Sequence, residues 1–472
     1  SMKKEDVDEA MFKPTEEIFE AQRRIFNVNE TFREVYTSML KVDKKMTAAM
    51  SADDEARRKF EKPRCVAEDV VAFVQENFTL DGGEIDPKSI VELNSYDDRN
   101  YYVRTVDGEH EYTIKVHNGV ESGRPGLLAA QSAIMRHLNA HGVSAPMPIK
   151  TNAGKLLEGV AAKVKGVAED IAFLLLPLPE SAQNFQRAHA VRVLTWIPGV
   201  IAERGARVVH TPKFLRDVGE FLGKMAKALE SFQHPGAERW HIWDNANVAS
   251  VRGLAHAVDD PEHRDLVDEV LCDFEAKVIP HASALRRGVC QNDANDQNVV
   301  VAVAKPSMSA EFFSPGGRPV DPTACPVGIL DFGDIVVTWR VNEIAIAAAY
   351  FALGKDDPIG DAVELLAGFE ANFPLTEIER QLLPTLIAAR LVCSCVCGAF
   401  SAAKDPSKKN YLLLTQKPGW AALRALRDAG DDVFLQRADE AARGMEKVKS
   451  RFASMRQSTQ VQRMRTHKNW AV

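Results

Sequence analysis

Two short stretches near the middle of the chain restrict its fold and its chemistry more than any other feature. In GVCQNDANDQNVVV, residues 288–301, Asp293 is followed five residues later by Asn298, and a β-branched run comes next. In VGILDFGD, residues 327–334, an apolar run ends at Asp331. A carboxylate that takes a hydroxyl proton, together with an amide oxygen and a second carboxylate that hold Mg²⁺, is the set that phosphoryl transfer from a nucleoside triphosphate requires.

The spacing assigns a role to each of these three residues. D-x-x-x-x-N followed by D-F-G is the kinase signature, so Asp293 is the predicted general base. Asn298 and Asp331 are the predicted metal ligands, because Mg²⁺ prefers hard oxygens and keeps few protein ligands beside phosphate and water. Taken singly, each residue could instead cap a turn or a helix. The two motifs in one chain favour the catalytic interpretation.

Composition sets the broad class. A chain of 472 residues has room for two or three domains or lobes, and 45% hydrophobic with 26% charged residues is ordinary for a globular protein. The formal charge of −7 gives no general reason to expect nucleic-acid binding. Seven unevenly spread cysteines do not form a disulfide framework. The first twenty residues lack the apolar core of a signal peptide, so we expect a cytoplasmic protein with reduced thiols.

The region before the two motifs predicts a small antiparallel sheet. Strand-like runs at 89–93, 101–105 and 111–116 include a strong hairpin signal at Asp107-Gly108, and a helix is expected over 127–138. Strand, loop, strand, hairpin, lysine-bearing strand and helix is the order of a kinase N-lobe. We assign the N-lobe to residues 66–196.

After a buried-type strand at 191–197, the pattern becomes helical. Pro198-Gly199 stops this strand where a hinge between lobes should lie, and the backbone there would bind a nucleotide base. The C-lobe is assigned to residues 197–435, with a loop rich in Pro, Gly and Ser at 305–326. The predicted fold is α+β and bilobal, like a protein kinase, with a small antiparallel-sheet N-lobe and a mainly helical C-lobe.

The two ends of the chain fall outside this pattern. Residues 1–65 predict an N-terminal helical extension, and residues 436–472 a basic helix or tail. Either end could mediate a homo-oligomer. No membrane span is expected, because the apolar segment 386–400 carries Arg390 in its middle and reads as a buried helix.

Lys115 stands on an alternating strand, where a kinase keeps a lysine for the α- and β-phosphates. A glutamate should project from the following helix, but the pattern places Gln131 there. An amide can hydrogen-bond an ammonium group without supplying the opposite charge. We therefore expect Lys115 to be held less firmly than in a kinase with the acid.

The loop NSYDDRN, residues 94–100, occupies the phosphate-covering turn and has no glycine. Ser95 and backbone N–H groups could face the phosphates. Asp97 and Asp98 would repel phosphates unless they turn toward Mg²⁺ or Lys115. A plain hairpin is the alternative.

The apolar segment 386–400 holds further candidates. Arg390 is either paired inside the protein or a ligand for a substrate carboxylate. Cys393, Cys395 and Cys397 invite a metal interpretation, but helical positions two apart point to different faces, so small core residues are expected.

Together these motifs resemble the aminoglycoside-phosphotransferase type of small-molecule kinases, and among them the hydroxylysine kinases. The resemblance covers roughly residues 66–430 and rests on SYDDRN, EYTIKV, VRVLTWIPG, FQHP followed by IWD, DANDQN, GILDFGD, LAGFE with PLTEIE, and KNYLLLTQKPGW. It implies a bilobal kinase-like fold. It also implies Mg²⁺-dependent transfer of the γ-phosphoryl group of GTP, or of ATP, to the hydroxyl of 5-hydroxylysine.

The resemblance also implies roles by matching position. The implied nucleotide contacts, besides Lys115, are Ser95, Tyr96, Asp97, Asp98 and the hinge residues Thr195 and Trp196. Glu343 steadies the catalytic loop, and Asp334 faces the ammonium groups of the substrate. The family reads His-Gly where this chain has Gln291 and Asn292. The first change alters the support of the loop, and the second matters if that position needs a positive φ, which asparagine tolerates better than most residues.

Two other functions stay open at this point. Fold-level similarity does not separate acceptors, so another amino-alcohol such as choline, homoserine or an aminoglycoside is an alternative. A substrate with carboxylate and ammonium groups needs Arg or backbone N–H groups beside an acid, whereas choline needs an aromatic cage. The altered loop residues also motivate a pseudokinase-like binding or scaffold protein.

Overall fold

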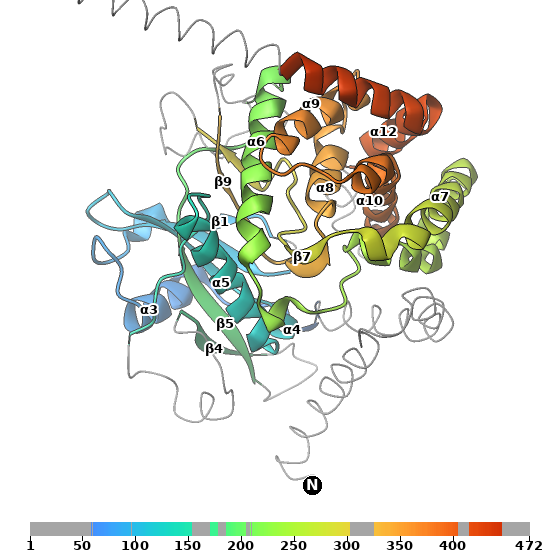
Figure 1. Cartoon of the computed structure of the whole chain (residues 1–472). Helices are drawn as coiled ribbons and strands as arrows, with labels where there is room; N and C mark the ends of the chain where they lie inside the picture. The colour runs from blue at the N-terminus through green and yellow to red at the C-terminus, as the bar shows by residue number, and fades with distance from the viewer. Residues whose placement is uncertain are drawn as a thin grey trace, which may run out of the picture.

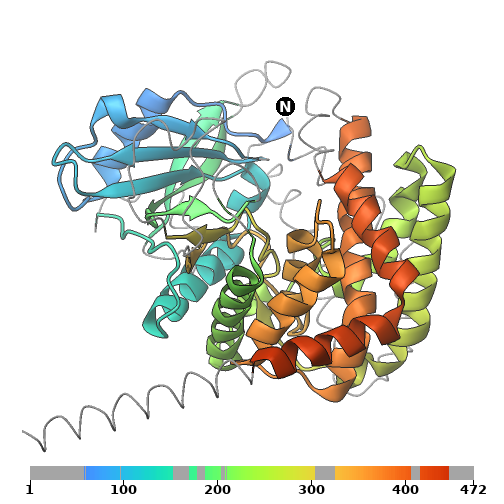
Figure 2. The ribbon, with the colours of Figure 1, turned by 90° about the horizontal axis from the view of Figure 1, so that it is seen from above.

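The computed structural model describes residues 58, 60–95, 97–152, 170–177, 186–203, 208, 210–302, 325–404 and 415–445. The helices expected in 1–57, Tyr96, most of the 305–326 loop and the tail beyond residue 445 lie outside the described residues, and with them the surfaces expected for self-association. The described chain forms a sheet lobe and a helical lobe that lie side by side (Figures 1 and 2). The predicted bilobal α+β fold, with a small antiparallel sheet in one lobe and helices in the other, is confirmed.

The first lobe is built on a five-stranded antiparallel sheet in the order β1-β2-β3-β5-β4. The strands are β1 (Val91–Leu93), β2 (Arg99–Arg104), β3 (Glu111–Val116), β4 (Ala172–Pro177) and β5 (Gln186–Thr195). On β3 the side chains alternate between buried and half-buried, so Ile114 enters the core while Lys115 points to the other face. The helix α3 (Ala67–Asn77) and the short 3₁₀ turn η1 (Pro87–Ser89) complete this side of the lobe.

The helix α5 (Pro125–Ala140) fixes the sheet lobe to the helical lobe. It follows the short helix α4 (Gly119–Ser122), and both views place it next to α6 (Figures 1 and 2). Most of its buried apolar side chains belong to the core of the helical lobe, and Leu128 packs toward the sheet. The ring Nε2 of His137 donates to the carbonyl of Ala228 at 2.9 Å. The helix is therefore anchored on both sides.

The helical lobe begins with β6 (Val200–Ile201) and α6 (Pro212–Ala228), followed by the 3₁₀ turns η4 (Leu229–Ser231), η5 (Pro235–Ala237) and η6 (Asn245–Ala257). Next come α7 (Pro261–Asp273), a π-helical turn η7 (Phe274–Val278) and η8 (Ile279–Ala284). The last helices are α8 (Asn342–Phe351), α9 (Pro358–Glu370), α10 (Glu377–Lys404), α12 (Gln416–Ala429) and a helix over 431–445. Most of these helices lie within the regions predicted to be helical.

Three of these helices begin in the same way. A side-chain oxygen of Thr211, Asp260 or Asp357 accepts a hydrogen bond from the first turn, and a proline follows at the first helical position. The cap satisfies one of the unpaired N–H groups of the helix end, and proline has no N–H there to leave unpaired. These starts can be read from the sequence alone.

Two small sheets carry the motif loops. The strand β7 (Arg287–Cys290) pairs with β10 (Val336–Trp339), and β8 (Val299–Val301) pairs with β6 and with β9 (Pro326–Ile329). The D-x-x-x-x-N loop connects β7 to β8, and the D-F-G-D loop connects β9 to β10. Because β7 pairs with β10 and β8 pairs with β9, the two loops lie beside each other at both of their ends.

The helix α10 carries the apolar segment in which Arg390 and the three clustered cysteines lie. Among the described residues it is the one helix long and apolar enough to cross a membrane, and 72% of its apolar window is buried inside the structure. Cys393, Cys395 and Cys397 are buried in the core, as predicted, and all seven cysteines are free thiols.

A close contact between α6 and α9 gives a test of the helical core. A Cβ atom at Gly219 would lie 2.0 Å from the carbonyl oxygen of Leu365. We expect Gly219→Ala to lower the free energy of unfolding by about 1–3 kcal/mol, because the two helix backbones must move apart. Urea unfolding followed by circular dichroism measures this. Gly253→Ala is the control, since a Cβ there meets nothing within 4 Å. Equal midpoints for the two variants would contradict the close contact.

Candidate active site

Asp293 lies at the centre of the loop between β7 and β8, and its carboxylate is held from two sides. Its Oδ1 lies 3.1 Å from Nη2 of Arg390, and its Oδ2 accepts from Nδ2 of Asn298 at 2.8 Å. The side chain is 22% exposed, so it can still meet a substrate. Burial, then Asp334 and Asp331, raise its pKa to about 8, while Arg390 opposes the rise.

Asn298 and Asp331 come together through the pairing of β8 with β9. The N–H of Leu330, directly before Asp331, donates to the carbonyl of Asn298 at 2.7 Å. The amide nitrogen of Asn298 is used by Asp293, which leaves its Oδ1 on the opposite side of the amide group. Asp331 has φ 47° and a side chain that is 50% exposed. An amide oxygen and an open carboxylate fit Mg²⁺, and these two residues are the ones that would hold it.

Lys115 on β3 approaches the same place from the sheet lobe. Its Nζ lies 3.1 Å from Oδ2 of Asp98 and 3.7 Å from Oδ1 of Asp331. Burial lowers its pKa, but Asp331, Asp98 and Glu121 raise it by more, so the ammonium group stays charged. The partner of Lys115 in the sheet lobe is therefore Asp98, in the phosphate-covering loop.

Among the described residues Gln131 forms its hydrogen bond with another cation and not with Lys115, so the expected contact was wrong. Its Oε1 accepts a hydrogen bond of 2.5 Å from Nη2 of Arg192, which is buried. Arg192 lies opposite Lys115 in the pairing of β3 with β5. Arg192, a buried cation on the neighbouring strand, thus binds the Gln131 amide that the sequence pattern had assigned to Lys115.

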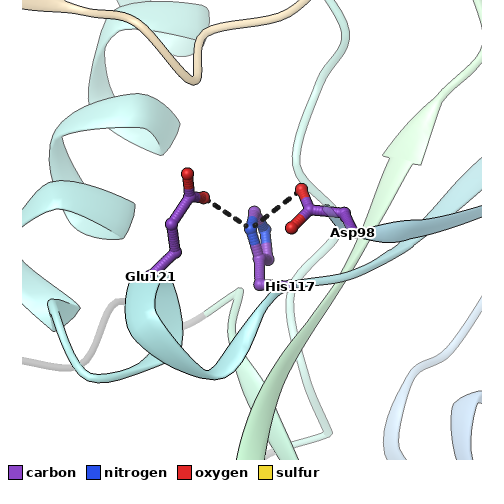
Figure 3. A group of neighbouring side chains, drawn as sticks. All are labelled: Asp98, His117 and Glu121. Carbon is purple, nitrogen blue, oxygen red and sulfur yellow. Dashed lines mark hydrogen bonds and ion pairs between the residues drawn. The ribbon is translucent and has the colours of Figure 1, made fainter. Parts of the chain in front are cut away.

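Asp98 and Glu121 lie on two sides of the His117 ring (Figure 3). Ligand atoms of the three residues lie within 4.8 Å of one another, which is the spacing of a metal site. However, Nε2 of His117 accepts from Nε of Arg192 at 2.9 Å, so the proton is on Nδ1, which donates to Glu121 at 3.2 Å. Burial and Arg192 lower the pKa of His117, which keeps the ring neutral.

Positive charge around this cluster already comes from side chains. Lys115 binds Asp98, and Arg58 lies 3.6 Å from Glu121. The proton on Nδ1 and these cations fill the roles that a metal ion would have. The cluster is a hydrogen-bonded support for Lys115.

Gln291 connects the two motif loops. Its Oε1 accepts from the N–H of Asp293 at 2.8 Å, and its Nε2 donates to the carbonyls of Leu330 and Asp331. Its own N–H donates to Glu343, a buried acid in the first turn of α8 whose pKa burial raises to about 7. A glutamine thus bonds both loops at the position where the family has histidine.

Asn292 adopts φ 67°, so this position does need the left-handed region. Asparagine enters this region more readily than most residues, which explains how it can replace a glycine here. Its Nδ2 donates to the carbonyl of Trp243 at 3.3 Å. The departure from the family pattern leaves the turn intact.

Arg390 is paired inside the protein. Its side chain is 1% exposed, and besides Asp293 it donates to the carbonyl of Trp243. Its guanidinium carbon lies 5.2 Å from the ring centre of Trp243 and 5.3 Å from that of Tyr350. In this arrangement Arg390 holds the predicted base, and a substrate carboxylate would have to displace Asp293 to reach it.

Asp334 forms the acidic wall beside Asp293. Its Oδ1 lies 2.9 Å from Nε2 of His241, and its side chain is 29% exposed. Burial would raise its pKa, but His241 and Arg239 lower it to about 2. Arg239 also donates to the carbonyls of Gly333 at 2.6 Å and Ile335 at 3.0 Å, which holds the D-F-G-D loop in place.

The hinge residues Thr195 and Trp196 use their backbone N–H groups inside the protein. The N–H of Thr195 donates to Met147 at 2.9 Å, and the N–H of Trp196 donates to Glu111 at 3.0 Å. Both backbone donors are thus used within the protein, so the backbone groups of these two residues that remain for a base are the carbonyls. Ser95 lies in the loop between β1 and β2, as expected.

Several residues of the site were missed in the sequence. His117, Glu121 and Arg192 support Lys115, and Arg239 and His241 surround Asp334. Alternation on β5 places Arg192 opposite Lys115, so its position on the sheet face was within reach of the sequence pattern. His117 and Glu121 follow Lys115 by two and six residues, so their short spacing was also a signal in the sequence. Arg239 and His241 depend on contacts with a distant segment that no local pattern reveals.

Comparisons with known proteins show which proteins this chain is similar to. Residues 89–310 match the Phosphotransferase enzyme family. The chain is 31% identical to a hydroxylysine kinase of Xenopus laevis over 73% of this chain and 86% of that protein. It is 30% identical to a hydroxylysine kinase of Mus musculus, over 78% of this chain and 91% of that protein. Among solved structures, an amicoumacin kinase in complex with AMP-PNP, Ca²⁺ and Ami is similar in fold, with a TM-score of 0.50 and 15% identity over 81% of this chain and 96% of that one.

The pairing of Asp293 with Arg390 predicts a pH effect. A base must be deprotonated to act, so kcat/KM should rise with pH as Asp293 loses its proton. The pKa of this rise should be no higher than about 8, because the positive charge of bound Mg²⁺ nearby favours the deprotonated form. Removing the cation in Arg390→Gln raises the pKa of Asp293, so the rising limb should move to higher pH by about 1 unit or more. Arg390→Lys keeps the charge and should move it less. Unchanged profiles in two folded variants would refute the pairing.

Proposed function

Because this chain belongs to the hydroxylysine kinase family of small-molecule phosphotransferases, and so transfers a phosphoryl group to an alcohol, we propose that its acceptor is the hydroxyl of 5-hydroxylysine and its donor is GTP. The preference for GTP rests on the family resemblance, and ATP is the alternative donor. We place the reaction in the cytoplasm, where the seven free thiols would stay reduced.

In this proposal the chain's own residues orient the reactants. Asp293 accepts a hydrogen bond from the acceptor hydroxyl and takes its proton late in the transfer, since the transition state of phosphoryl transfer is loose. Lys115 binds phosphate oxygens of the donor. Asn298 and Asp331 would hold Mg²⁺, which neutralises the charge on the phosphates when bound. Gln291 keeps the two motif loops at a constant separation.

The observation that carries the choice of acceptor is the carboxylate of Asp334. It is partly exposed, it keeps its negative charge, and it lies near enough to Asp293 to raise the pKa of that residue. In 5-hydroxylysine the hydroxyl and the side-chain ammonium sit on neighbouring carbon atoms. One substrate can therefore place its hydroxyl at Asp293 while its ammonium group meets Asp334. Homoserine separates the two groups by one more carbon.

The aromatic rings near the base argue against a quaternary ammonium acceptor. Trp243 and Tyr350 both lie against the guanidinium of Arg390, so they are already occupied by a cation of the protein. A choline site needs open aromatic faces around the trimethylammonium group. Among the described residues near Asp293, a substrate would therefore meet charged side chains such as Asp334 and not an aromatic cage.

The scaffold alternative loses its main support. It rested on Gln291, Asn292 and Gln131, which replace residues expected in an active kinase. Gln291 bonds both loops, and Asn292 adopts the required backbone conformation. Asp98 supplies the negative charge at Lys115 that Gln131 does not.

Replacing the base tests the chemistry. Asp293→Asn keeps the size of the side chain but cannot take a proton, so turnover should fall by at least about 10²-fold, the low end of what a positioned base contributes. The measurement is phosphate transfer with Mg²⁺ and either GTP or ATP. Asp432→Asn, an exposed change on the helix over 431–445, is the control and should turn over like the wild type. Equal rates for Asp293→Asn and the wild type would exclude this base.

The acceptor is tested with a panel of amino-alcohols. We expect 5-hydroxylysine to have the highest kcat/KM, ahead of homoserine, choline and an aminoglycoside. Asp334→Asn should raise KM for 5-hydroxylysine by about tenfold or more, because one charge-assisted contact to the ammonium group is lost. KM for the nucleotide should change little. A higher kcat/KM for choline, or an unchanged KM in Asp334→Asn, would overturn the proposed acceptor.

A further inference from the structure

A cation that precedes the whole sheet lobe reaches the phosphate-covering loop. Arg58 lies before α3, and also before residue 89, where the match to the Phosphotransferase enzyme family begins. Its Nη1 lies 3.1 Å from Oδ2 of Asp97 and 3.6 Å from Oε1 of Glu121. Asp97 belongs to the loop between β1 and β2, and Glu121 belongs to α4. One guanidinium group therefore joins two elements that support Lys115.

The backbone around Arg58 is tied to the start of α4. The side-chain amide of Asn118 donates to the carbonyl of Arg58 at 2.7 Å, and the N–H of Gly119 donates to the carbonyl of Glu61 at 3.0 Å. The N–H of Asn118 also donates to Oδ1 of Asp98 at 2.8 Å. These bonds place Arg58 beside the loop through the same short segment that positions Asp98.

The carboxylates around Lys115 explain why a cation such as Arg58 is required beside the phosphate-covering loop. Asp97, Asp98, Glu121 and Asp331 surround the position where Lys115 would meet the phosphates. Lys115 balances Asp98, and a neutral His117 donates to Glu121. Arg58 faces Asp97, whose side chain is 17% exposed. Without that cation, Asp97 would repel a nucleoside triphosphate from a loop that must lie close to it.

The charge of Arg58 also acts on the helical lobe. Burial and Arg239 lower the pKa of His241 in the helical lobe, and the charge of Arg58 adds to this effect. The side chain is 23% exposed, and its two carboxylate partners are less exposed, at 17% and 11%. A partly buried arrangement of this kind is screened less by solvent than an ordinary surface ion pair.

We propose that Arg58 is a positioning residue of the nucleotide site, which holds Asp97 in the phosphate-covering loop so that Ser95 faces the phosphates. The inference rests on the proposed nucleotide site and does not depend on the identity of the acceptor. One nitrogen of the guanidinium, Nη1, lies near both carboxylates. Arginine suits this place because its charge is delocalised and always present, whereas lysine offers a compact and strongly hydrated point charge.

Nucleotide binding without acceptor is the direct test. Isothermal titration of the full-length protein with Mg²⁺–GTP and with Mg²⁺–ATP should give a Kd about tenfold weaker for Arg58→Gln than for the wild type, as expected for one lost contact between charged groups. Arg58→Lys should lie between the two. With saturating nucleotide, kcat should stay within about twofold, since the loss falls on binding and not on the later step.

A matched control separates this role from general stability. Arg437 also pairs with an aspartate, Asp357, at 2.8 Å, and its side chain is 34% exposed, but it lies on the helix over 431–445 in the other lobe. Arg437→Gln should leave the Kd for nucleotide unchanged. Melting temperatures are measured for every variant. A purely structural role for Arg58 would lower the melting temperature and leave the Kd of the folded protein unchanged, which would overturn the proposal.

The route through Asp97 is tested by a double-mutant cycle. If Arg58 acts by holding and neutralising Asp97, Arg58→Gln should weaken binding by less than about twofold in an Asp97→Asn background, because coupled residues are not additive. A full tenfold loss in that background would mean that Arg58 acts without Asp97 and would overturn the route. Wild-type protein that binds neither nucleotide would overturn the nucleotide site itself. Wild-type binding that Arg58→Gln leaves unchanged would overturn only the role of Arg58.

Discussion

The pairing of β8 with β9 is the constraint on which the rest of the site depends. Val299 lies opposite Ile329, and the ladder is extended by the bond from the N–H of Leu330 to the carbonyl of Asn298. A shift of one residue would turn every side chain of one strand to the other face. Asn298 and Asp331 then could not serve one ion, and Gln291 could not bond the backbone of both loops.

The site concentrates negative charge, and the fold places cations beside these carboxylates. Arg390 holds Asp293, Arg239 helps to lower the pKa of Asp334, and Lys115 reaches both Asp98 and Asp331. Buried charges are tolerated only when they are paired and hydrogen-bonded. These cations come from both lobes, so the balance of charge at the site depends on α5 and the contacts by which it holds the lobes together.

Departures from the family pattern are explained by local chemistry. Gln291 has both a donor and an acceptor on one short amide, so it can bond two carbonyls and one N–H, where a neutral histidine ring has one of each. Asn292 enters the left-handed region without glycine. The missing acid on α5 is offset by Asp98, because the phosphate-covering loop turns that carboxylate toward Lys115.

The sequence by itself predicted the bilobal fold, most of the strands and helices, and the two motif loops that bring Asp293, Asn298 and Asp331 close to Lys115. Those features follow from local signals: alternation on strands, proline after a helix cap, and fixed spacing within one loop. Only the tertiary structure decided which residue balances each charge. The carboxylate partners of Arg390, Arg239 and Arg58 lie far away from them along the chain. A charge pair depends on distance in space, which no spacing in the sequence encodes.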